Sequence, residues 1–223
     1  MQRMKASVII VAGGFGSRMQ ANTPKQFLNV NGNPILFYTI RCFDSFIKGI
    51  PIILVLPEPY IDYWKSIIKK NNFNCAHQIT SGGETRFQSV KNGLELISEP
   101  GLIAIHDGVR PLVSKETLQR VFTKAEKEGN AIPAIPINES IRKIAAENTE
   151  QVNRDHYRLI QTPQCFHSDI IRQAYEQEYR EEFTDDATVV EAMGIKINLV
   201  EGNPENIKIT RPVDLKIAEA LLR

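Results

Sequence analysis

The segment VIIVAGGFGSRM, residues 8–19, decides the fold class. Its first five residues are apolar and mostly β-branched, which is typical of a strand in a parallel sheet that helices cover on both faces. Glycines follow at once, and a glycine turn lets backbone N–H groups approach an anion closely because no Cβ stands in the way. The segment therefore predicts a buried strand followed by a loop suited to an anion.

The loop Gly13–Met19 departs from two common nucleotide motifs. No Gly-Lys-Ser/Thr follows it, as a P-loop requires, and Met19 stands where the dinucleotide fingerprint needs a third small residue. Two cations come next, Arg18 at the end of the loop and Lys25 within the TPKQF segment at 23–27. Cations beside a glycine loop suit phosphoryl or nucleotidyl transfer, whose transition state carries negative charge on phosphate oxygens. A tight turn with solvated surface cations is the alternative.

Strand and helix patterns alternate along the rest of the chain. Apolar runs predict strands at 8–12, 52–56, 77–80, 102–105, 131–137 and 197–200. Helical patterns lie at 33–46 (with Asn33 as N-cap and Pro34 as first helical residue), 60–70, 83–97, 114–129, 168–180, 185–193 and 212–222. Two prolines, Pro133 and Pro136, place the fifth strand at an edge or a bulge. The alternation predicts an α/β fold with a doubly wound, mostly parallel sheet.

The segment from Asn138 to Gln164 interrupts this alternation. Polar stretches that could form strands, 140–145 and 151–159, flank a turn-like sequence at 147–150. A two-stranded ribbon is marginally stable alone in water, so we expect a protruding β-hairpin arm that leans on a second subunit in a dimer. A mobile surface hairpin is the alternative. The sequence thus predicts one domain over residues 1–223 with an arm subdomain at about 138–164.

Composition excludes several classes of protein. The 223 residues carry 27 Lys plus Arg and 26 Asp plus Glu, and a net charge of +1 gives no general attraction to nucleic acid. The longest apolar runs are strand-sized, too short to span a membrane or to form a signal-peptide core. Cys42, Cys75 and Cys165 are far apart and odd in number, which argues against disulfides or a zinc site. We therefore expect a cytoplasmic protein that binds neither nucleic acid nor membrane.

Several motifs resemble those of a known family. The glycine loop Gly14-x-Gly16-x-Arg18-Met19 is followed by Pro24-Lys25-Gln26-Phe27. Further matches come in family order: Gly82-Gly83-x-x-Arg86-x-x-Ser89-Val90, His106-Asp107-x-x-Arg110-Pro111, Gln161-Thr162-Pro163-Gln164, Thr184-Asp185-Asp186-Ala187, and Asn206-Ile207-Lys208-x-Thr210-Arg211-Pro212. Together they resemble nucleotidyltransferases of the nucleotide-sugar type and, among these, the 2-C-methyl-D-erythritol 4-phosphate cytidylyltransferase family.

The resemblance implies a reaction. The phosphate of 2-C-methyl-D-erythritol 4-phosphate attacks the α-phosphorus of CTP, releases pyrophosphate and forms 4-diphosphocytidyl-2-C-methyl-D-erythritol for isoprenoid synthesis. Mg²⁺ is implied as a cofactor held mainly by the CTP phosphates, with no residue of the chain assigned as its ligand. A phosphate monoester is already anionic, so the site needs no Ser-His or Cys-His nucleophile. The family is homodimeric, and its arm completes the neighbour's site.

The resemblance also implies roles for individual residues. It assigns catalysis to Arg18, Lys25, Arg154 and Lys208. It assigns CTP binding to Ala12, Gly13, Gly14, Gly16, Gly83, Glu84, Ser89, Asp107 and Gly108. It assigns the acceptor substrate to Arg110, Ser140, Thr162 and Thr184. With Arg86 nearby, these residues predict a focused positive cleft behind the near-zero net charge, and His106 is expected to be a packed residue.

Two departures and two alternatives remain. Gly13 and Gly108 replace alanines that are usual in the family, and Glu139-Ser140 stands in place of Asp-Thr in the acceptor pocket. A ribitol-5-phosphate cytidylyltransferase shares the glycine loop, the PKQF segment and the HD…RP motif, although the NIKIT and TPQ segments favour methylerythritol phosphate. A nucleotide-binding sensor without turnover is the second alternative, and the presence of all four catalytic cations argues against it.

Overall fold

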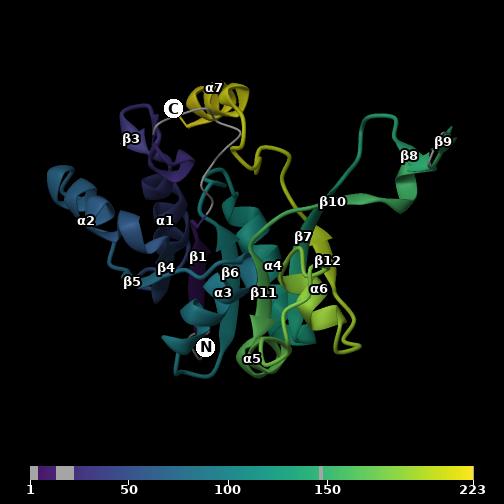
Figure 1. The fold of residues 1–223 in the computed structure, drawn as a ribbon, viewed down its shortest axis with the longest axis horizontal. Helices are drawn as coiled ribbons and strands as arrows, with labels where there is room; N and C mark the ends of the chain where they lie inside the picture. Colours follow the sequence, from purple (N-terminus) through teal and green to yellow (C-terminus); the bar gives the residue numbers. More distant parts are fainter. Residues whose placement is uncertain (1–4, 14–22, 146–147, 223) are drawn as a thin grey trace.

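The computed structural model describes residues 5–13, 23–145 and 148–222. These residues form an eight-stranded sheet in the order β10-β7-β11-β6-β1-β4-β5, with β12 paired to β7 (Figure 1). The strands are β1 (Ala6–Val11), β4 (Ile52–Leu56), β5 (Gln78–Ser81), β6 (Leu102–Asp107), β7 (Asn130–Pro136), β10 (Arg158–Ile160), β11 (Gln164–His167) and β12 (Leu199–Glu201). Strands β10 and β11 run antiparallel to their neighbours, and the other pairings are parallel. The predicted α/β fold with a mostly parallel sheet is confirmed.

Helices cover both faces of the sheet. Residues Val8 and Ile10 of β1 pack in one buried cluster with α1, α2 and α4, whereas Ile9 packs in a second cluster with α3, α5 and α6. Side chains alternate between the faces of a strand, so the two clusters are the two layers of a doubly wound fold. The helices are α1 (Ile35–Phe46), α2 (Ile61–Lys70), α3 (Arg86–Glu95), α4 (Lys115–Glu128), α5 (Ser168–Ala174), α6 (Asp186–Glu191) and α7 (Pro212–Leu221).

Helix ends show where local signals decide the structure. Helix α4 has the predicted ends, because Ser114 Oγ accepts a hydrogen bond from the Thr117 backbone and Gly129 takes a left-handed φ of 85°. Helix α1 differs from the prediction, because Pro34 is its N-cap rather than its first residue. Residues 33–34 instead pair as β3 (Asn33–Pro34) with β2 (Asn29–Val30). This pairing keeps the backbone extended up to Ile35.

Three predicted elements near the C-terminus have different bounds. The helix predicted at 168–180 ends at Ala174, where the chain turns and the Tyr175 ring stacks on Phe87 with centroids 4.6 Å apart. The helix predicted at 185–193 starts one residue later, because Asp185 is its N-cap, and it ends at Glu191. The strand predicted at 197–200 is β12, which starts two residues later and ends one residue later. Tertiary contacts set these ends more strongly than local periodicity does.

The two prolines do not place β7 at an edge of the sheet, but the pairing is bulged opposite Pro133. Ile160 pairs with Ala134 and Cys165 with Ala131, so that residues 161–164 face only 132–133. Strand β7 pairs with β10, β11 and β12 and so has neighbours on both sides. Pro133 is tolerated because its carbonyl accepts from the Gln161 backbone N–H, 2.8 Å away, at the junction between β10 and β11. The chain of β10 and β11 bends there at Thr162-Pro163, so no ladder bond requires the N–H that proline lacks.

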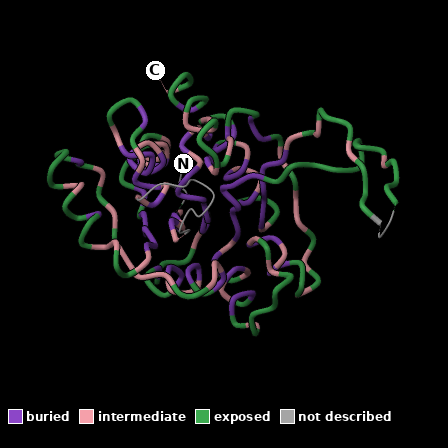
Figure 2. Tube along the Cα trace, turned by 45° about the horizontal axis from the view of Figure 1, so that its top comes forward, coloured by how far each residue is buried: buried purple, intermediate pink, exposed green. Residues whose placement is uncertain are grey.

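The arm is present but shorter than predicted. Strand β8 (Arg142–Ala145) pairs antiparallel with β9 (Asn148–Gln151), and the hairpin projects from the body of the molecule (Figure 1). The predicted strand at 151–159 and turn at 147–150 are wrong, because β9 starts at Asn148 and residues 158–160 pair with β7 in the main sheet. Most of the hairpin is exposed (Figure 2). No helix among the described residues is long and apolar enough to cross a membrane.

Candidate active site

A cavity of about 310 Å³ opens at the carboxyl ends of β1 and β6. Ala12 and Gly13 at the end of β1 and Asp107 at the end of β6 line it, as do the loop before α3 and the segment that leads to α7. Open α/β sheets bind ligands at this end of their strands, where the chain passes from one strand to the next helix. The cavity is therefore the candidate active site.

The structure brings together most of the predicted site residues that it describes. Those lining the cavity are Ala12, Gly13, Lys25, Gly83, Glu84, Ser89, Asp107 and Lys208. Gly108 and Arg110 belong to the turn that follows Asp107, and Thr162 contacts the backbone of Asp107. Gly14, Gly16 and Arg18 lie outside the described residues.

Three predicted residues lie away from this cavity. Ser140 and Arg154 line a separate hollow at the arm, where Arg154 Nη1 donates to the Asn138 carbonyl. Thr184 is exposed in the turn before α6. Within this chain the arm residues Ser140 and Arg154 therefore do not contribute to the cavity.

Lys25 is held at the cavity by its neighbours. Pro24 precedes a short 3₁₀ helix, Lys25–Phe27, in which Phe27 is buried against the edge of the Tyr63 ring. Gln26 is buried, and its Nε2 donates to the Ala12 carbonyl at 2.7 Å. This bond ties the lysine segment to the end of β1. Gln26 belongs to the PKQF motif, but only the fold shows that its side chain reaches the end of β1.

Asp107 lies among cations. Its Oδ2 is 3.0 Å from Arg110 Nε and 3.1 Å from Lys208 Nζ. Burial alone would raise the pKa of the Asp107 carboxyl, but the charges of Lys208, Arg86 and Arg110 lower this pKa well below its usual range. The carboxylate therefore stays ionised throughout the neutral range and holds Lys208 at the cavity.

Small residues shape the other wall of the cavity. Ser89 Oγ accepts from the Gly83 backbone N–H at 3.2 Å and donates to the Thr85 carbonyl at 2.9 Å. A Cβ on Gly82 would lie 2.8 Å from Ser89 Oγ, closer than such atoms approach. The loop can therefore pack this closely against Ser89 only with glycine at position 82.

Arg86 has a different role from the one predicted. Its Nη1 and Nη2 donate to the two carboxylate oxygens of Asp186 at 2.8 and 2.6 Å, and the Tyr175 hydroxyl donates to Asp186 Oδ1 at 2.6 Å. Asp186 is fully buried. Arg110 is likewise paired, with Asp107. Buried carboxylates therefore offset part of the charge of the predicted positive cleft, since Asp186 pairs with Arg86 and Asp107 is shared by Arg110 and Lys208.

Replacing Asp186 with asparagine is expected to lower the free energy of unfolding by about 3–5 kcal/mol, because the change leaves the Arg86 guanidinium without its buried counter-charge. Urea unfolding at neutral pH measures this loss. Tyr175→Phe is the matched control, since it removes one hydroxyl that donates to the charged carboxylate and is expected to cost about 2 kcal/mol. A loss for Asp186→Asn no larger than that of the control would contradict the assigned role of the ion pair.

His106 gives the protein a pH dependence. Burial is the main cause that lowers the pKa of the imidazole from 6.5 to about 4. The unfolded chain therefore takes up a proton as the pH falls from 6.5 to 4, while the folded protein does not. The contribution of His106 to the free energy of unfolding is fully present above pH 6.5. This free energy is expected to fall by about 3 kcal/mol as the pH drops from 6.5 to 4. His106→Gln does not titrate, so unfolding measured at several pH values should show a smaller loss for this variant.

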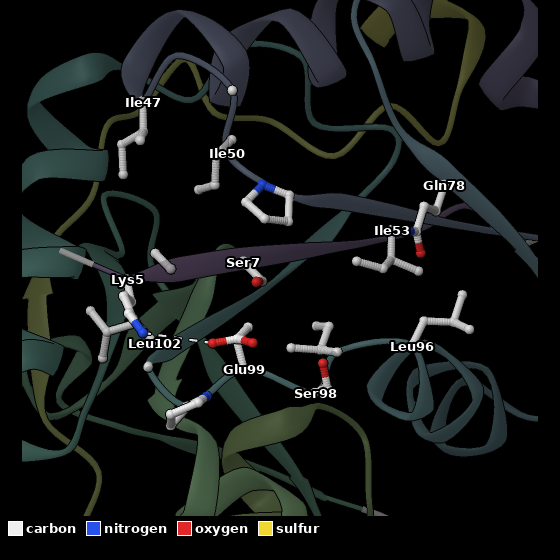
Figure 3. Close-up of a pocket in the computed structure, with 16 residues that line it drawn as sticks. Lys5, Ser7, Ile47, Ile50, Ile53, Gln78, Leu96, Ser98, Glu99 and Leu102 are labelled. Carbon is white, nitrogen blue, oxygen red and sulfur yellow. Dashed lines mark ion pairs between the residues drawn. The ribbon is translucent and has the colours of Figure 1, made fainter. Parts of the chain in front are cut away.

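A larger cavity, of about 580 Å³, lies at the opposite ends of the strands. Figure 3 shows Ser7 and Ile53 lining it beside the ends of β1 and β4, with an ion pair between Lys5 and Glu99 of 3.6 Å at its side. Its lining is mostly apolar and contains none of the predicted site residues. Size therefore does not identify the active site, whereas the position at the carboxyl ends of the strands does.

The described residues offer no metal site of the usual protein kind. No group of three or more His, Cys, Asp or Glu side chains in the described ranges could hold a metal ion. The carboxylates at the cavity are those of Asp107 and Glu84. This donor set fits a cation that a phosphate ligand mainly coordinates, because Mg²⁺ commonly binds one or two carboxylates together with substrate phosphates.

Comparisons with known proteins place the chain in a family. Residues 6–223 match the family described as 2-C-methyl-D-erythritol 4-phosphate cytidylyltransferase. A relative of that name from Bacteroides thetaiotaomicron is 50% identical over 219 residues, which cover 98% of this chain and 100% of the relative. The crystal structure of 4-diphosphocytidyl-2C-methyl-D-erythritol synthase from Anaerococcus prevotii superposes with a TM-score of 0.81 at 31% identity, covering 98% of this chain and 96% of that chain. The crystal structure of 2-C-methyl-D-erythritol 4-phosphate cytidylyltransferase from Thermus thermophilus gives 0.78 at 33% identity, covering 98% of each chain. The chain therefore belongs to the 2-C-methyl-D-erythritol 4-phosphate cytidylyltransferase family.

Proposed function

We propose that the protein transfers the cytidylyl group of CTP to 2-C-methyl-D-erythritol 4-phosphate and releases pyrophosphate. The product is 4-diphosphocytidyl-2-C-methyl-D-erythritol, an intermediate of isoprenoid synthesis. The observation that carries the proposal is the cavity in which Lys25, Lys208 and Asp107 meet the glycine loop before α3, in a chain of this family. We further infer a cytoplasmic enzyme, in keeping with free thiols at Cys42, Cys75 and Cys165.

The mechanism depends on charge rather than on a protein nucleophile. The acceptor's phosphate oxygen attacks the α-phosphorus of CTP, and the bond from that phosphorus to the pyrophosphate oxygen breaks. Lys25, together with Arg18, stabilises the negative charge that builds on the α-phosphate oxygens. Gly83 and Ser89 hold the cytosine, and Ala12, Gly13, Gly14 and Gly16 are the further candidates for contacts to the nucleotide. Gly108 supports this wall from behind, because a Cβ at this position would lie 2.8 Å from the Ala12 Cβ. Because the acceptor phosphate is already ionised, no residue has to remove a proton.

Lys208 and Arg154 are proposed to hold the acceptor phosphate. The Lys208 side chain is 42% exposed and ion-paired with Asp107, so its ammonium is both oriented and accessible from the cavity. Ion pairing with a second anion needs only a small change of rotamer, since three donors radiate from Nζ. Arg110, Ser140 and Thr184 are the remaining candidates for contacts to the acceptor, whereas Thr162, which the resemblance also assigned to the acceptor, is buried and does not line the cavity.

Mg²⁺ is proposed to arrive with the phosphates of CTP. Asp107 and Glu84 are the carboxylates of the cavity that could meet it directly or through water. When bound, the cation neutralises charge on the phosphates and on the leaving pyrophosphate.

We propose that residues 1–223 form one nucleotidyltransferase domain whose arm subdomain, at about 138–164, joins two copies in a homodimer. Apolar side chains on and beside the arm support this, because Ile144, Tyr157 and Leu159 are 75%, 46% and 49% exposed in the single chain. Burial against a second copy would remove this apolar surface from water. The arm would then bring Arg154 to the neighbour's cavity, which it does not reach within its own chain.

Pyrophosphate release tests the proposal. The purified protein is assayed with CTP and Mg²⁺ and with either methylerythritol 4-phosphate or ribitol 5-phosphate. Release with methylerythritol 4-phosphate at much the higher kcat/KM supports the proposed activity. A preference for ribitol 5-phosphate would assign the alternative acceptor, and folded protein that binds CTP without release would be a sensor.

A further inference from the structure

We propose that His106 and Thr162 are positioning residues of the nucleotidyl-transfer site, which fix Asp107 and thereby Lys208 through one directed chain of hydrogen bonds. The inference rests on the proposed function, because it assigns these residues an effect on that reaction. Both side chains are buried, and neither lines the cavity. They would therefore act on the substrates through Asp107 and Lys208 rather than by contact.

The direction of each bond in the chain follows from the chemistry of its ends. His106 Nε2 lies 3.0 Å from the Arg110 carbonyl oxygen, which can only accept, so Nε2 carries the proton. In the neutral ring Nδ1 is then an acceptor, and the Thr162 hydroxyl 3.0 Å away donates to it. With its proton so directed, Thr162 Oγ1 accepts from the Asp107 backbone N–H at 3.1 Å. While the ring stays neutral, donor and acceptor cannot exchange roles in any of these hydrogen bonds.

Surroundings keep the imidazole neutral and in one orientation. The Phe43 ring meets it edge-on with centroids 4.9 Å apart, and the position is fully buried. Its charged neighbours are the Asp107 carboxylate and the cations of Arg110 and Lys208. Full burial disfavours a charged ring, and a neutral ring has one nitrogen that donates and one that accepts, as the carbonyl and the hydroxyl beside it require. A buried ring held in this way specifies one tautomer.

The chain of bonds joins both ends of the turn that carries Asp107. It holds the Asp107 N–H at the start of the turn and the Arg110 carbonyl at its end, and the Arg110 N–H closes the turn on the Asp107 carbonyl at 3.1 Å. The Asp107 side chain emerges from this fixed backbone toward Lys208. A shift of the turn would therefore move the ion pair that orients Lys208.

Thr162 also connects this turn to the segment that carries Lys208. Its carbonyl accepts from Asn206 Nδ2 at 2.8 Å, and the Asn206 carbonyl accepts from Arg110 Nη1 at 2.7 Å. Thr162 thus holds both the backbone segment that carries Asp107 and the segment that carries Lys208. A residue that merely filled the core would need no such pair of directed bonds, and an apolar side chain of similar size could replace it.

Paired substitutions separate the two bonds of His106. Glutamine can keep the donor toward the Arg110 carbonyl but loses the acceptor for Thr162, whereas asparagine can keep an acceptor near the Nδ1 position. At Thr162, valine removes the hydroxyl with little change of shape, and serine retains it. We expect Thr162→Val and His106→Gln each to lower kcat by about tenfold with little change in the Kd of CTP, because misplaced charge slows the chemical step more than binding. Thr162→Ser should recover most of this loss, whereas His106→Asn, which loses the donor to the Arg110 carbonyl, should be about as slow as His106→Gln.

The double variant His106→Gln/Thr162→Val gives the decisive comparison. If both residues act through one chain, it should be no slower than the slower single variant. The proposal would be overturned if the losses of kcat in the two single variants multiply in the double variant. It would also be overturned if Thr162→Ser is as slow as Thr162→Val although it unfolds at the same urea concentration as the unsubstituted protein.

Nuclear magnetic resonance of ¹⁵N-labelled imidazoles tests the chain without any turnover. The resonances absent from His106→Gln identify His106, and their shifts should show a protonated Nε2 and an unprotonated Nδ1 at pH 7. In Thr162→Val the Nδ1 resonance should shift as its hydrogen bond is lost. A protonated Nδ1 in the unsubstituted protein would overturn the proposed chain of hydrogen bonds. If the spectrum is as expected but the protein has no transferase activity, the hydrogen bonds stand and only the proposed function is refuted.

Discussion

Replacing Lys25 with alanine is expected to lower kcat by about 10²- to 10³-fold while the Kd of CTP changes little, since the loss of one preorganised charge at a developing oxyanion has an effect of this size. The 3₁₀ helix and the bond from Gln26 to β1 hold the Lys25 segment at the cavity before substrate arrives. Its charge therefore need not be reorganised during the reaction, and its interaction strengthens as charge builds on the α-phosphate.

Single-turnover kinetics of pyrophosphate release and equilibrium binding of CTP measure the two quantities separately. Lys70→Ala, an exposed lysine at the end of α2, is the matched control and should change neither. A loss confined to CTP affinity, with kcat retained at saturating CTP, would assign Lys25 to ground-state binding and contradict the proposed transition-state role.

Gln26→Leu extends the same test to the support of Lys25. The variant keeps the buried volume but removes the donor to the Ala12 carbonyl, so Lys25 is retained on a less firmly held segment. An intermediate loss of kcat is expected, smaller than that of Lys25→Ala.

The layered fold could be predicted from the sequence because its signals are local. The apolar run at residues 8–12, the Ser114 cap and the Gly129 stop each depend on a few neighbouring residues, and each has the predicted outcome. Strand β11 could not be predicted in this way. Only Cys165 and Phe166 give it an apolar signal, and its place between β6 and β7 depends on pairings with residues far away in sequence.

The same distinction applies to the site. The family resemblance assigned Lys25, Asp107 and Lys208 to one site, and the structure brings these three residues to one cavity. What the sequence could not show is which charges are already paired. The motif around Arg86 contains no partner for this cation, because its partner Asp186 lies 100 residues away along the chain. Only tertiary structure brings such a pair together, and it changes the net charge that a ligand meets.

Mixing two inactive variants is expected to restore about a quarter of the activity per chain, if the arm of one subunit completes the site of the other. Lys25→Ala removes a residue of the cavity, and Arg154→Ala removes a residue of the arm. In a mixed dimer one site then carries both changes, whereas the other site combines an unchanged cavity with an unchanged arm. Random assortment makes half of the dimers mixed, and half of their sites are intact.

The two proteins are unfolded together, refolded, and assayed for pyrophosphate release with saturating substrates. Each variant treated alone is the control and should stay nearly inactive. Mixed dimers are verified independently by an affinity tag on one of the two variants. If verified mixed dimers stay as inactive as the parents, Arg154 does not act across the interface. If the Arg154→Ala protein alone is fully active, the arginine is not part of the site at all. Recovery near one quarter is the result that only a shared site explains, because a site built within one chain would remain defective in every combination of these two subunits.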